Sequence, residues 1–232
     1  MNKIAIVTGG TSDIGMGIIK ELLRRDYKVI ATYYSTTPKF EQNNLIWRHV
    51  NLSSHASLYE FIHYVIDSYS HINIFIHNAS RIYRKNFLDM SDADIDEVFE
   101  TNVLSCYKLI RGLYNLFING AKIIVTGSHM GTVPHSVSPI YGMSKSALHA
   151  LVKNMVKVLE PKSITINAVV PGFVETKLQI DKPIEIRNNI YNKTAIHRFA
   201  DVDEIVKGYI FCLDNDFVNG SLIEINGGYD YK

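Results

Sequence analysis

The chain has 232 residues, of which 47% are hydrophobic and 20% are charged. This length and composition are those of a globular protein with a sizeable core, and they exclude a largely disordered chain. With 24 basic and 23 acidic residues the net charge is +1, so no overall field attracts nucleic acid or an anionic membrane, and neither is expected as a partner.

The cysteines and the hydropathy bear on the compartment. Cys106 and Cys212 lie far apart within apolar helical patterns, which predicts two reduced, buried thiols. The apolar run at the N-terminus is too short for a signal peptide, and no later run reaches the roughly 20 residues that span a membrane. These features predict a cytoplasmic protein.

Short apolar runs alternate along the chain with longer amphipathic stretches. The runs that predict strands span residues 4–7, 28–34, 45–50, 73–77, 122–126, 163–170 and 221–225. Helical periodicity occupies residues 14–25, 58–68, 95–118, 141–159 and 202–213. This alternation predicts an α/β fold, with a parallel sheet of about seven strands and helices on both faces. No repeat or linker divides the chain, so we expect one domain over residues 1–232.

Residues 173–200 form the most irregular region. Pro183 and a polar mixture interrupt any period there. A stretch of that length without regular structure is more often functional than a plain connection. We expect it to act as a lid or substrate loop.

A glycine-rich turn, residues 8–15 (TGGTSDIG), joins the first predicted strand to a helix. Such a turn lets backbone N–H groups and the helix N-terminus approach a phosphate, so Gly9, Thr11, Ser12, Asp13 and Ile14 are candidate dinucleotide-binding residues. Asp13 leaves two alternatives open, because a carboxylate repels a pyrophosphate but also caps a helix. Either Asp13 turns away as a cap while Thr11 and Ser12 contact the cofactor, or dinucleotide affinity is weakened.

The end of the second predicted strand bears on which dinucleotide binds. An acidic residue there would hydrogen-bond the ribose 2′-hydroxyl of NAD, and residues 29–37 contain no Asp or Glu. Tyr34 and Ser35 offer hydroxyls to a 2′-phosphate, with an ordinary turn as the alternative. NADP is therefore favoured over NAD.

Ser128, Tyr141 and Lys145 carry the chemistry of a third pattern. Ser128 follows the apolar residues 121–127, at the carboxyl end of a predicted strand, where open α/β sheets bind ligands. Tyr141 and Lys145 follow Pro139 and lie four residues apart, on one face of a helix. A fixed positive charge beside a phenol lowers its pKa toward the range useful for acid–base catalysis. A surface pair is the alternative for the tyrosine and lysine alone.

The spacing of Ser128, Tyr141 and Lys145 resembles the Ser and Tyr-x-x-x-Lys centre of the short-chain dehydrogenase/reductase family. Residues 8–15 resemble its Thr-Gly-x-x-x-Gly-x-Gly turn, with Asp13 in place of the middle glycine. Residues 78–80 (NAS) resemble its Asn-Ala-Gly turn in the form familiar from pteridine reductases, and residues 171–176 match Pro-Gly-x-x-x-Thr. Because these motifs occur in the right order, the resemblance covers essentially the whole chain.

The resemblance implies a three-layer, doubly wound Rossmann fold that binds NADP or NAD and needs no metal. Ser128 would hydrogen-bond the substrate oxygen, Tyr141 would exchange its proton, and Lys145 would lower the pKa of Tyr141 and hold the nicotinamide ribose. Asn102 would hold a water that links Lys145 to solvent. The further cofactor-binding residues that it implies, beyond those of the glycine-rich turn and the second strand, are Asn51, Leu52, Asn78, Ala79, Ser80, Tyr141, Lys145, Pro171, Gly172, Val174 and Thr176.

The reaction implied is hydride transfer between nicotinamide and a small carbonyl or alcohol compound, by a carbonyl reductase or alcohol dehydrogenase. The catalytic and C-terminal half resembles 3-oxoacyl-carrier-protein reductases. Two alternatives stay open: a sensor or scaffold that binds the dinucleotide without turnover, and a pteridine-type reductase. The basic residues 81–85 face either a phosphate, an acidic carrier or only solvent. We expect a mostly apolar substrate pocket lined by Ile82, Tyr83, Met130, Ile140, Phe173 and Leu178.

The helix predicted over residues 141–159 is apolar on two sides. One stripe, which we expect to face the sheet, consists of Leu148, Leu151, Val152, Met155, Val156 and Leu159. A second face of smaller residues consists of Ala147, Ala150 and Val158. A helix of this kind packs against a partner, so we expect a homo-oligomer, either a dimer or a tetramer.

Overall fold

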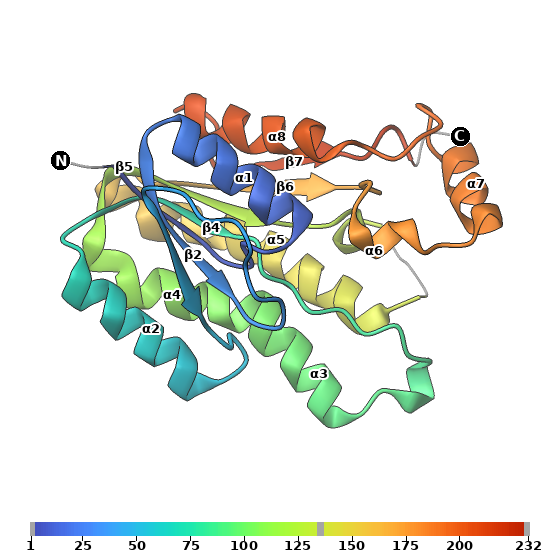
Figure 1. Cartoon of the computed structure of the whole chain (residues 1–232), viewed down its shortest axis with the longest axis horizontal. Helices are drawn as coiled ribbons and strands as arrows, with labels where there is room; N and C mark the ends of the chain where they lie inside the picture. Colours follow the sequence, from blue (N-terminus) through green and yellow to red (C-terminus); the bar gives the residue numbers. More distant parts are fainter. Residues whose placement is uncertain (1–2, 134–136, 230–232) are drawn as a thin grey trace.

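The computed structural model describes residues 3–133 and 137–229. Seven parallel strands form one sheet in the order β3-β2-β1-β4-β5-β6-β7 (Figure 1). The strands are β1 (Lys3–Val7), β2 (Tyr27–Tyr33), β3 (Leu45–His49), β4 (Ile72–His77), β5 (Phe117–Thr126), β6 (Thr165–Pro171) and β7 (Leu222–Ile225). All seven predicted strands are present, which confirms the doubly wound α/β class.

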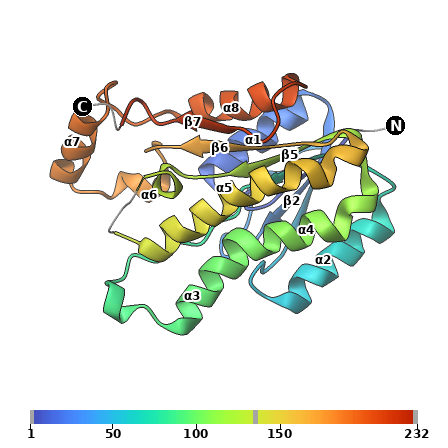
Figure 2. The ribbon, with the colours of Figure 1, turned by 180° about the vertical axis from the view of Figure 1, so that it is seen from behind.

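Helices cover both faces of the sheet, and Figures 1 and 2 show the three layers. One face carries α1 (Asp13–Arg24) and α8 (Val202–Asp214). The other carries α2 (His55–Ser68), α4 (Ser105–Leu113) and α5 (Pro139–Leu159). Each face of the sheet packs against its helices in a separate hydrophobic core, and alternate residues of β1 belong to the two cores. Ala5 and Val7 pack toward α1 and α8, and Ile4 and Ile6 pack toward the other layer. A strand buried on both faces must be apolar throughout, which is why these strands read as continuous runs.

The helix predicted over residues 95–118 is present as far as Leu113, with a π-helical turn within it, and its predicted end is wrong. The helix α3 (Asp92–Phe99) is followed by a π-helical turn, η2 (Glu100–Leu104), and then by α4. Phe117 already belongs to β5, where it pairs with Ile72 of β4. Leu113 and Phe117 keep a helical spacing and are both buried, so apolar periodicity alone does not mark the end of the helix.

The segment of residues 173–200 contains α6 (Lys177–Ile180) and α7 (Ile184–Lys193), so the expectation of irregular structure is only partly met. Its two ends are joined by a bridge between Val174 and Ala200. The Glu175 N–H donates to the Ala200 carbonyl at 2.8 Å, and the Ala200 N–H donates to the Phe173 carbonyl at 2.9 Å. The segment therefore leaves and returns at one point, and α6 and α7 lie beyond the carboxyl ends of the strands (Figure 1).

The long helix α5 matches its predicted stripe. Leu148, Val152 and Leu159 are buried in the core against the sheet, whereas Ala150 and Val158 are exposed. Within residues 3–133 and 137–229, no helix combines the length and the apolar character needed to cross a bilayer.

Candidate active site

A cavity of about 450 Å³ runs along the carboxyl edge of the sheet, from the glycine-rich turn after β1 to Tyr141 and Lys145 on α5. The predicted cofactor residues that line it are Gly9, Thr11, Ser12, Ile14, Tyr34, Ser35, Asn51, Leu52, Asn78, Ala79, Ser80, Tyr141 and Lys145. Sequence reasoning did not assign further lining residues, namely Thr32, Tyr33, Thr36, Val50, Arg81, Glu97, Thr101 and Thr126. The cavity thus brings together segments that follow β1, β2, β3 and β4.

Five predicted cofactor residues lie outside that lining. Pro171 and Gly172 line a second cavity instead. Val174 is buried in its bridge to Ala200, and Thr176 is the residue before α6. Asp13 is the fifth.

The glycine-rich turn is packed so closely that two of its glycines leave no room for a side chain. Gly9 has φ +65°, and a Cβ there would lie 2.7 Å from the Ala79 Cα. A Cβ at Gly15 would lie 2.4 Å from the Gly9 carbonyl oxygen. Ser12 accepts the Gly15 N–H at 3.1 Å, which starts α1 with its N-terminus at the cavity, where its dipole attracts an anion. This close-packed cradle and the cavity beside it fit a dinucleotide.

Asp13 is turned away from the cavity. Its Oδ2 accepts the Lys177 N–H at 2.8 Å, which links the turn to the start of α6. Of the two alternatives raised by the sequence, the structure has the carboxylate turned away. The prediction that it caps α1 is wrong, because Ser12, one residue earlier, makes the capping hydrogen bond.

Asn102 lies in the π-helical turn η2 and is fully buried. Its Oδ1 accepts the Arg81 N–H at 2.7 Å and the Ser80 hydroxyl at 3.2 Å. Its Nδ2 donates to the Arg81 carbonyl at 3.0 Å and to the Ser144 hydroxyl at 2.9 Å. All four hydrogen-bonding positions of the amide are therefore used to hold the segment after β4 against α5. A π-turn of this kind is frequent at functional sites.

The hydroxyls of Ser80 and Ser128 lie on the two sides of the Tyr141 site, Ser80 in the lining of the first cavity and Ser128 just past the end of β5, where it accepts the Met130 N–H at 3.2 Å. Burial raises the pKa of Tyr141 above its ordinary value, while the hydroxyls of Ser80 and Ser128 and the charge of Arg84 act in the opposite direction. Tyr141 therefore keeps its proton at neutral pH.

Lys145 lies one turn after Tyr141 on α5 and is 1% exposed. Its Nζ donates to the Thr126 carbonyl at 2.7 Å and lies 5.6 Å from the centre of the Tyr141 ring. Burial lowers the pKa of Lys145 to about 7. The amine that was expected to lower the pKa of Tyr141 is thus only partly charged at neutral pH, and burial dominates for the phenol.

Two buried histidines beside this centre were missed by sequence reasoning. His149 lies eight residues after Tyr141 on the same face of α5, and its Nε2 accepts the Ser128 N–H at 3.3 Å. Burial, with the charges of Lys145 and another lysine, lowers the pKa of His149 to about 4, so the ring is a neutral acceptor. The spacing of eight residues was the signal that could have identified it.

The second histidine, His77, ends β4. Thr8 Oγ1 accepts the N–H groups of Asn78 and Ala79, each at 3.0 Å, so its own hydrogen points to the His77 Nδ1 at 3.2 Å. Burial and the charge of Lys145 lower the pKa of His77 to about 3. The ring is therefore neutral and ties β1 to β4 beneath the cavity.

A second cavity, of about 500 Å³, meets the first at Tyr141, the residue that lines both. Three residues expected in the substrate pocket line it: Ile82, Met130 and Phe173. Ile140 and Tyr83 are not part of its lining, and the side chain of Leu178 lies outside the described part of the structure. The cavity opens beneath α6 and α7.

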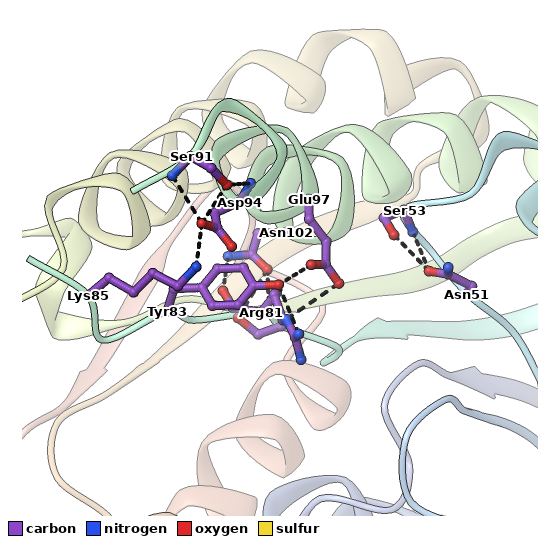
Figure 3. Close-up of polar contacts among 10 residues, drawn as sticks. Asn51, Ser53, Arg81, Tyr83, Lys85, Ser91, Asp94, Glu97 and Asn102 are labelled. Atoms are coloured by element: carbon purple, nitrogen blue, oxygen red, sulfur yellow. Dashed lines mark hydrogen bonds and ion pairs between the residues drawn. The ribbon is translucent and has the colours of Figure 1, made fainter. Parts of the chain in front are cut away.

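The basic segment of residues 81–85 is held by acidic residues of α3, as Figure 3 shows. Arg81 Nε lies 3.4 Å from Glu97 Oε1, and the Tyr83 hydroxyl donates to the same carboxylate. Lys85 Nζ donates to Asp94 Oδ2 at 2.6 Å. Two of the three cations in this segment therefore have carboxylate partners and do not form an open basic loop.

Comparison with known proteins identifies the family of this chain. A family model for short chain dehydrogenases matches residues 3–185. The chain belongs to the short-chain dehydrogenase family, and it is an oxidoreductase of that family.

Individual relatives agree over nearly the full length. The 3-oxoacyl-[acyl-carrier-protein] reductase FabG of Salmonella typhimurium is 26% identical over 97% of this chain and 96% of its own length. The crystal structure of a short chain dehydrogenase family protein from Francisella tularensis superposes with a TM-score of 0.90 at 26% identity, covering 99% of both chains. A short chain dehydrogenase from Burkholderia cenocepacia was solved in complex with NADP and superposes with a TM-score of 0.88, over 98% of this chain and 97% of its own. At 22% identity this similarity shows a shared fold only.

Proposed function

We propose that this chain is an NADPH-dependent carbonyl reductase in which Tyr141 delivers the proton. The observation that carries the proposal is the position of Tyr141, which lines both cavities and shares the second with Ser128, whose hydroxyl lowers the pKa of the phenol. Two hydroxyls at the junction of a dinucleotide site and a substrate site are suited to bind one carbonyl oxygen.

A reduced nicotinamide dinucleotide, when bound, supplies the hydride to the carbonyl carbon. Ser128 and Tyr141 hold the carbonyl oxygen and stabilise the negative charge that develops on it. Tyr141 then transfers its proton to that oxygen, which completes the alcohol. A phenol is protonated at neutral pH, and this is the form that donates a proton in the reductive direction. Lys145 binds the nicotinamide ribose, and His149 holds the Ser128 backbone in position.

The neighbourhood of β2 supports NADP over NAD. The cavity lining after this strand includes Tyr34, Ser35 and Thr36, and residues 33–37 contain no carboxylate. Glu97, which also lines the cavity, is engaged by Arg81 and by a tyrosine. The lining therefore offers hydroxyls to a 2′-phosphate and no free carboxylate to repel it. We expect a KM for NADPH at least about tenfold below that for NADH.

An enzyme is favoured over a dinucleotide sensor because Asp13, the residue that departs from the glycine-rich pattern of the family's enzymes, has another role. Its carboxylate is bonded to the Lys177 N–H outside the dinucleotide cavity. The substrate class that we propose is a ketone or oxo-acyl compound. 3-Oxoacyl thioesters belong in the panel because the relative from Salmonella typhimurium is named for reducing them.

Tyr141→Phe tests the proposal. The purified chain is mixed with NADPH and a panel of ketones, oxo acids, oxo esters, oxoacyl-pantetheine thioesters and pterins, and NADPH oxidation is followed. Removal of one hydroxyl should lower kcat by at least about 10²-fold, since general acid catalysis contributes about 10²–10⁴. NADPH binding, measured by its fluorescence, should change little.

Tyr27→Phe is the matched control, because Tyr27 begins β2, far along the strand from the carboxyl edge, and touches neither of the two cavities at Tyr141. Full turnover by Tyr141→Phe would refute the assigned role of the phenol. NADPH binding with no turnover of any compound by the unaltered chain would instead favour a sensor.

We further propose that the chain is a homo-oligomer, a dimer or a tetramer, which associates through α4 and α5. Figure 2 shows these helices side by side on one face. A hollow of about 220 Å³ between them is lined by Tyr107, Ile110, Arg111, Tyr114, Met155 and Val158. Val158 and Tyr107 are 56% and 46% exposed, which is the kind of apolar surface that a partner copy covers. Sedimentation of the unaltered chain as a monomer would contradict this.

A reducing compartment such as the cytoplasm is also proposed. Cys106 and Cys212 are both free and buried, and burial raises the pKa of both thiols, which makes them inert core residues.

A further inference from the structure

We propose that the substrate carries an anionic group, a carboxylate or a phosphate, which is bound between Arg84 and Lys182 in the cavity beneath α6 and α7. This inference rests on the proposed function and names its substrate class. It adds a charged end to a pocket whose lining is otherwise mostly apolar, as expected from the sequence.

The charge of the cavity is the first observation. Its lining includes the cations Arg84, Lys182 and Lys193, and none of the described residues that line it is an Asp or a Glu. Lys182 and Lys193 are half-buried, so their charges are partly withdrawn from water. A concave, low-dielectric site lined by one sign of charge concentrates ligands of the opposite sign.

The second observation is that neighbouring cations have partners while these do not. In the segment of residues 81–85, Arg81 and Lys85 pair with carboxylates of α3 (Figure 3). In α7, Arg187 pairs with Glu175 at 2.5 Å. Within residues 3–133 and 137–229 no carboxylate forms an ion pair with Arg84 or Lys182. The carboxylates of Asp94, Glu97 and Glu175 are therefore paired with cations that do not line this cavity.

The third observation is that Arg84 and Lys182 line the same cavity, although one follows β4 and the other joins α6 to α7. Burial and the charge of Arg84 both lower the pKa of Lys182. Two like charges brought into one cavity raise the free energy of the empty site, and a bound anion relieves that repulsion. A carboxylate or phosphate accepts several charge-assisted hydrogen bonds at once, and guanidinium and ammonium groups are its usual donors.

The anion site is within reach of the reacting centre. The charge of Arg84 acts on the Tyr141 hydroxyl, and Tyr141 shares the cavity with Arg84 and Lys182. Apolar side chains, including Met130 and Phe173, line other parts of it. The geometry therefore fits an oxo compound whose carbonyl lies at Tyr141 and whose charged group lies at Arg84 and Lys182.

Pairs of compounds that differ only in charge test the inference. NADPH oxidation is measured with 2-oxobutanoate, 3-oxobutanoate and 4-oxopentanoate, each against its methyl ester, and with dihydroxyacetone phosphate against dihydroxyacetone. The first three pairs report a carboxylate and the last a phosphate. We expect kcat/KM for the charged member of at least one pair to exceed that of its neutral analogue by at least about tenfold. The reason is that the neutral analogue would leave the cations of the site without a partner.

Arg84→Gln and Lys182→Gln should each lower that ratio, and the double variant should bring it close to one. Lys85→Gln is the matched control, because Lys85 lies beside Arg84 in the sequence but pairs with Asp94 outside the cavity, and the ratio should not change. A binding measurement without dinucleotide accompanies the kinetics: calorimetric titration with the corresponding hydroxy acid should show at least about tenfold weaker binding by the double variant.

The outcomes separate the two proposals. If neutral esters, ketones or pantetheine thioesters are reduced and no charged analogue is preferred, the anion site is refuted while the reductase function stands. A preference for the charged member that survives in the double variant refutes the assignment to Arg84 and Lys182. If the unaltered chain reduces no compound of either kind, the proposed function fails and the anion site fails with it.

Discussion

Replacing Lys145 by methionine is expected to stabilise the empty protein at neutral and slightly acidic pH. Lys145 is 1% exposed, and burial lowers its pKa from 10.5 to about 7. Because each pH unit corresponds to 1.36 kcal/mol, the charged amine destabilises the fold by about 5 kcal/mol relative to the neutral amine. Methionine keeps the length and apolar stem but leaves the Thr126 carbonyl without its 2.7 Å donor, which costs about 1–3 kcal/mol. The net gain at pH 6.5 is about 2–4 kcal/mol.

The pH dependence gives a sharper test. Between pH 7 and 10.5 the unfolded chain binds the proton of Lys145 and the folded chain does not, so the stability of the unaltered protein rises with pH. At pH 9.5 it has regained about 3 kcal/mol, and the advantage of Lys145→Met should have largely disappeared. Urea unfolding at pH 6.5 and 9.5, followed by Trp47 fluorescence at one protein concentration, measures both differences.

Lys153→Met is the control, since Lys153 is exposed on the same helix and should show a small effect that does not depend on pH. If Lys145→Met is less stable than the unaltered protein at pH 6.5, or if its advantage is the same at both pH values, the account of a buried charge is wrong. Activity should be lost in either case, because the destabilising amine belongs to the active site.

Three further predictions concern the same region. The pKa of His149 is about 4 in the folded protein and 6.5 in the unfolded chain, so the unfolded chain takes up the proton first as pH falls. The free energy of unfolding should therefore drop by about 3 kcal/mol between pH 6.5 and 4. Urea unfolding of His149→Gln should show a smaller decline over the same pH range. Gly9→Ala should weaken NADPH binding by at least about tenfold in a fluorescence titration, because a Cβ would lie 2.7 Å from Ala79 Cα at φ +65°, and unchanged binding would contradict the cradle. Asp13→Ala should leave NADPH affinity within about threefold, since the carboxylate is bonded to Lys177; tightening by more than tenfold would mean that it repels the phosphates.

The fold could be predicted because its strands are buried on both faces, and such strands are apolar throughout. The candidate site was predictable where it depends on local sequence: Gly9 and Gly15 mark the turn, and Tyr141 and Lys145 share a helix face at any tertiary arrangement. These features are fixed by backbone conformation and by helical geometry. They do not depend on what packs against them.

The parts that sequence could not give depend on contacts between distant segments. Ser12 and Asp13 are both residue types that cap helices, and the sequence does not show that Ser12 caps α1 while Asp13 accepts a hydrogen bond from the distant Lys177. Nothing within residues 81–85 distinguishes Arg84 from its neighbours, because the carboxylates that pair with those neighbours come from α3. The direction of the pKa of Tyr141 likewise depends on how deeply the phenol is buried, which spacing along a helix does not report.

The two fastened ends of the 173–200 segment limit which part of it moves. Its base is closed by the bridge between Val174 and Ala200, and Lys177 is bonded to Asp13. A hydrogen bond to a carboxylate contributes about 1.5–3 kcal/mol, so displacement of Lys177 is disfavoured. We therefore expect the motion that admits a substrate to involve α6 and α7, which Pro183 separates, rather than the base of the segment. Substrate and product would then exchange on this side while the glycine-rich turn stays in place.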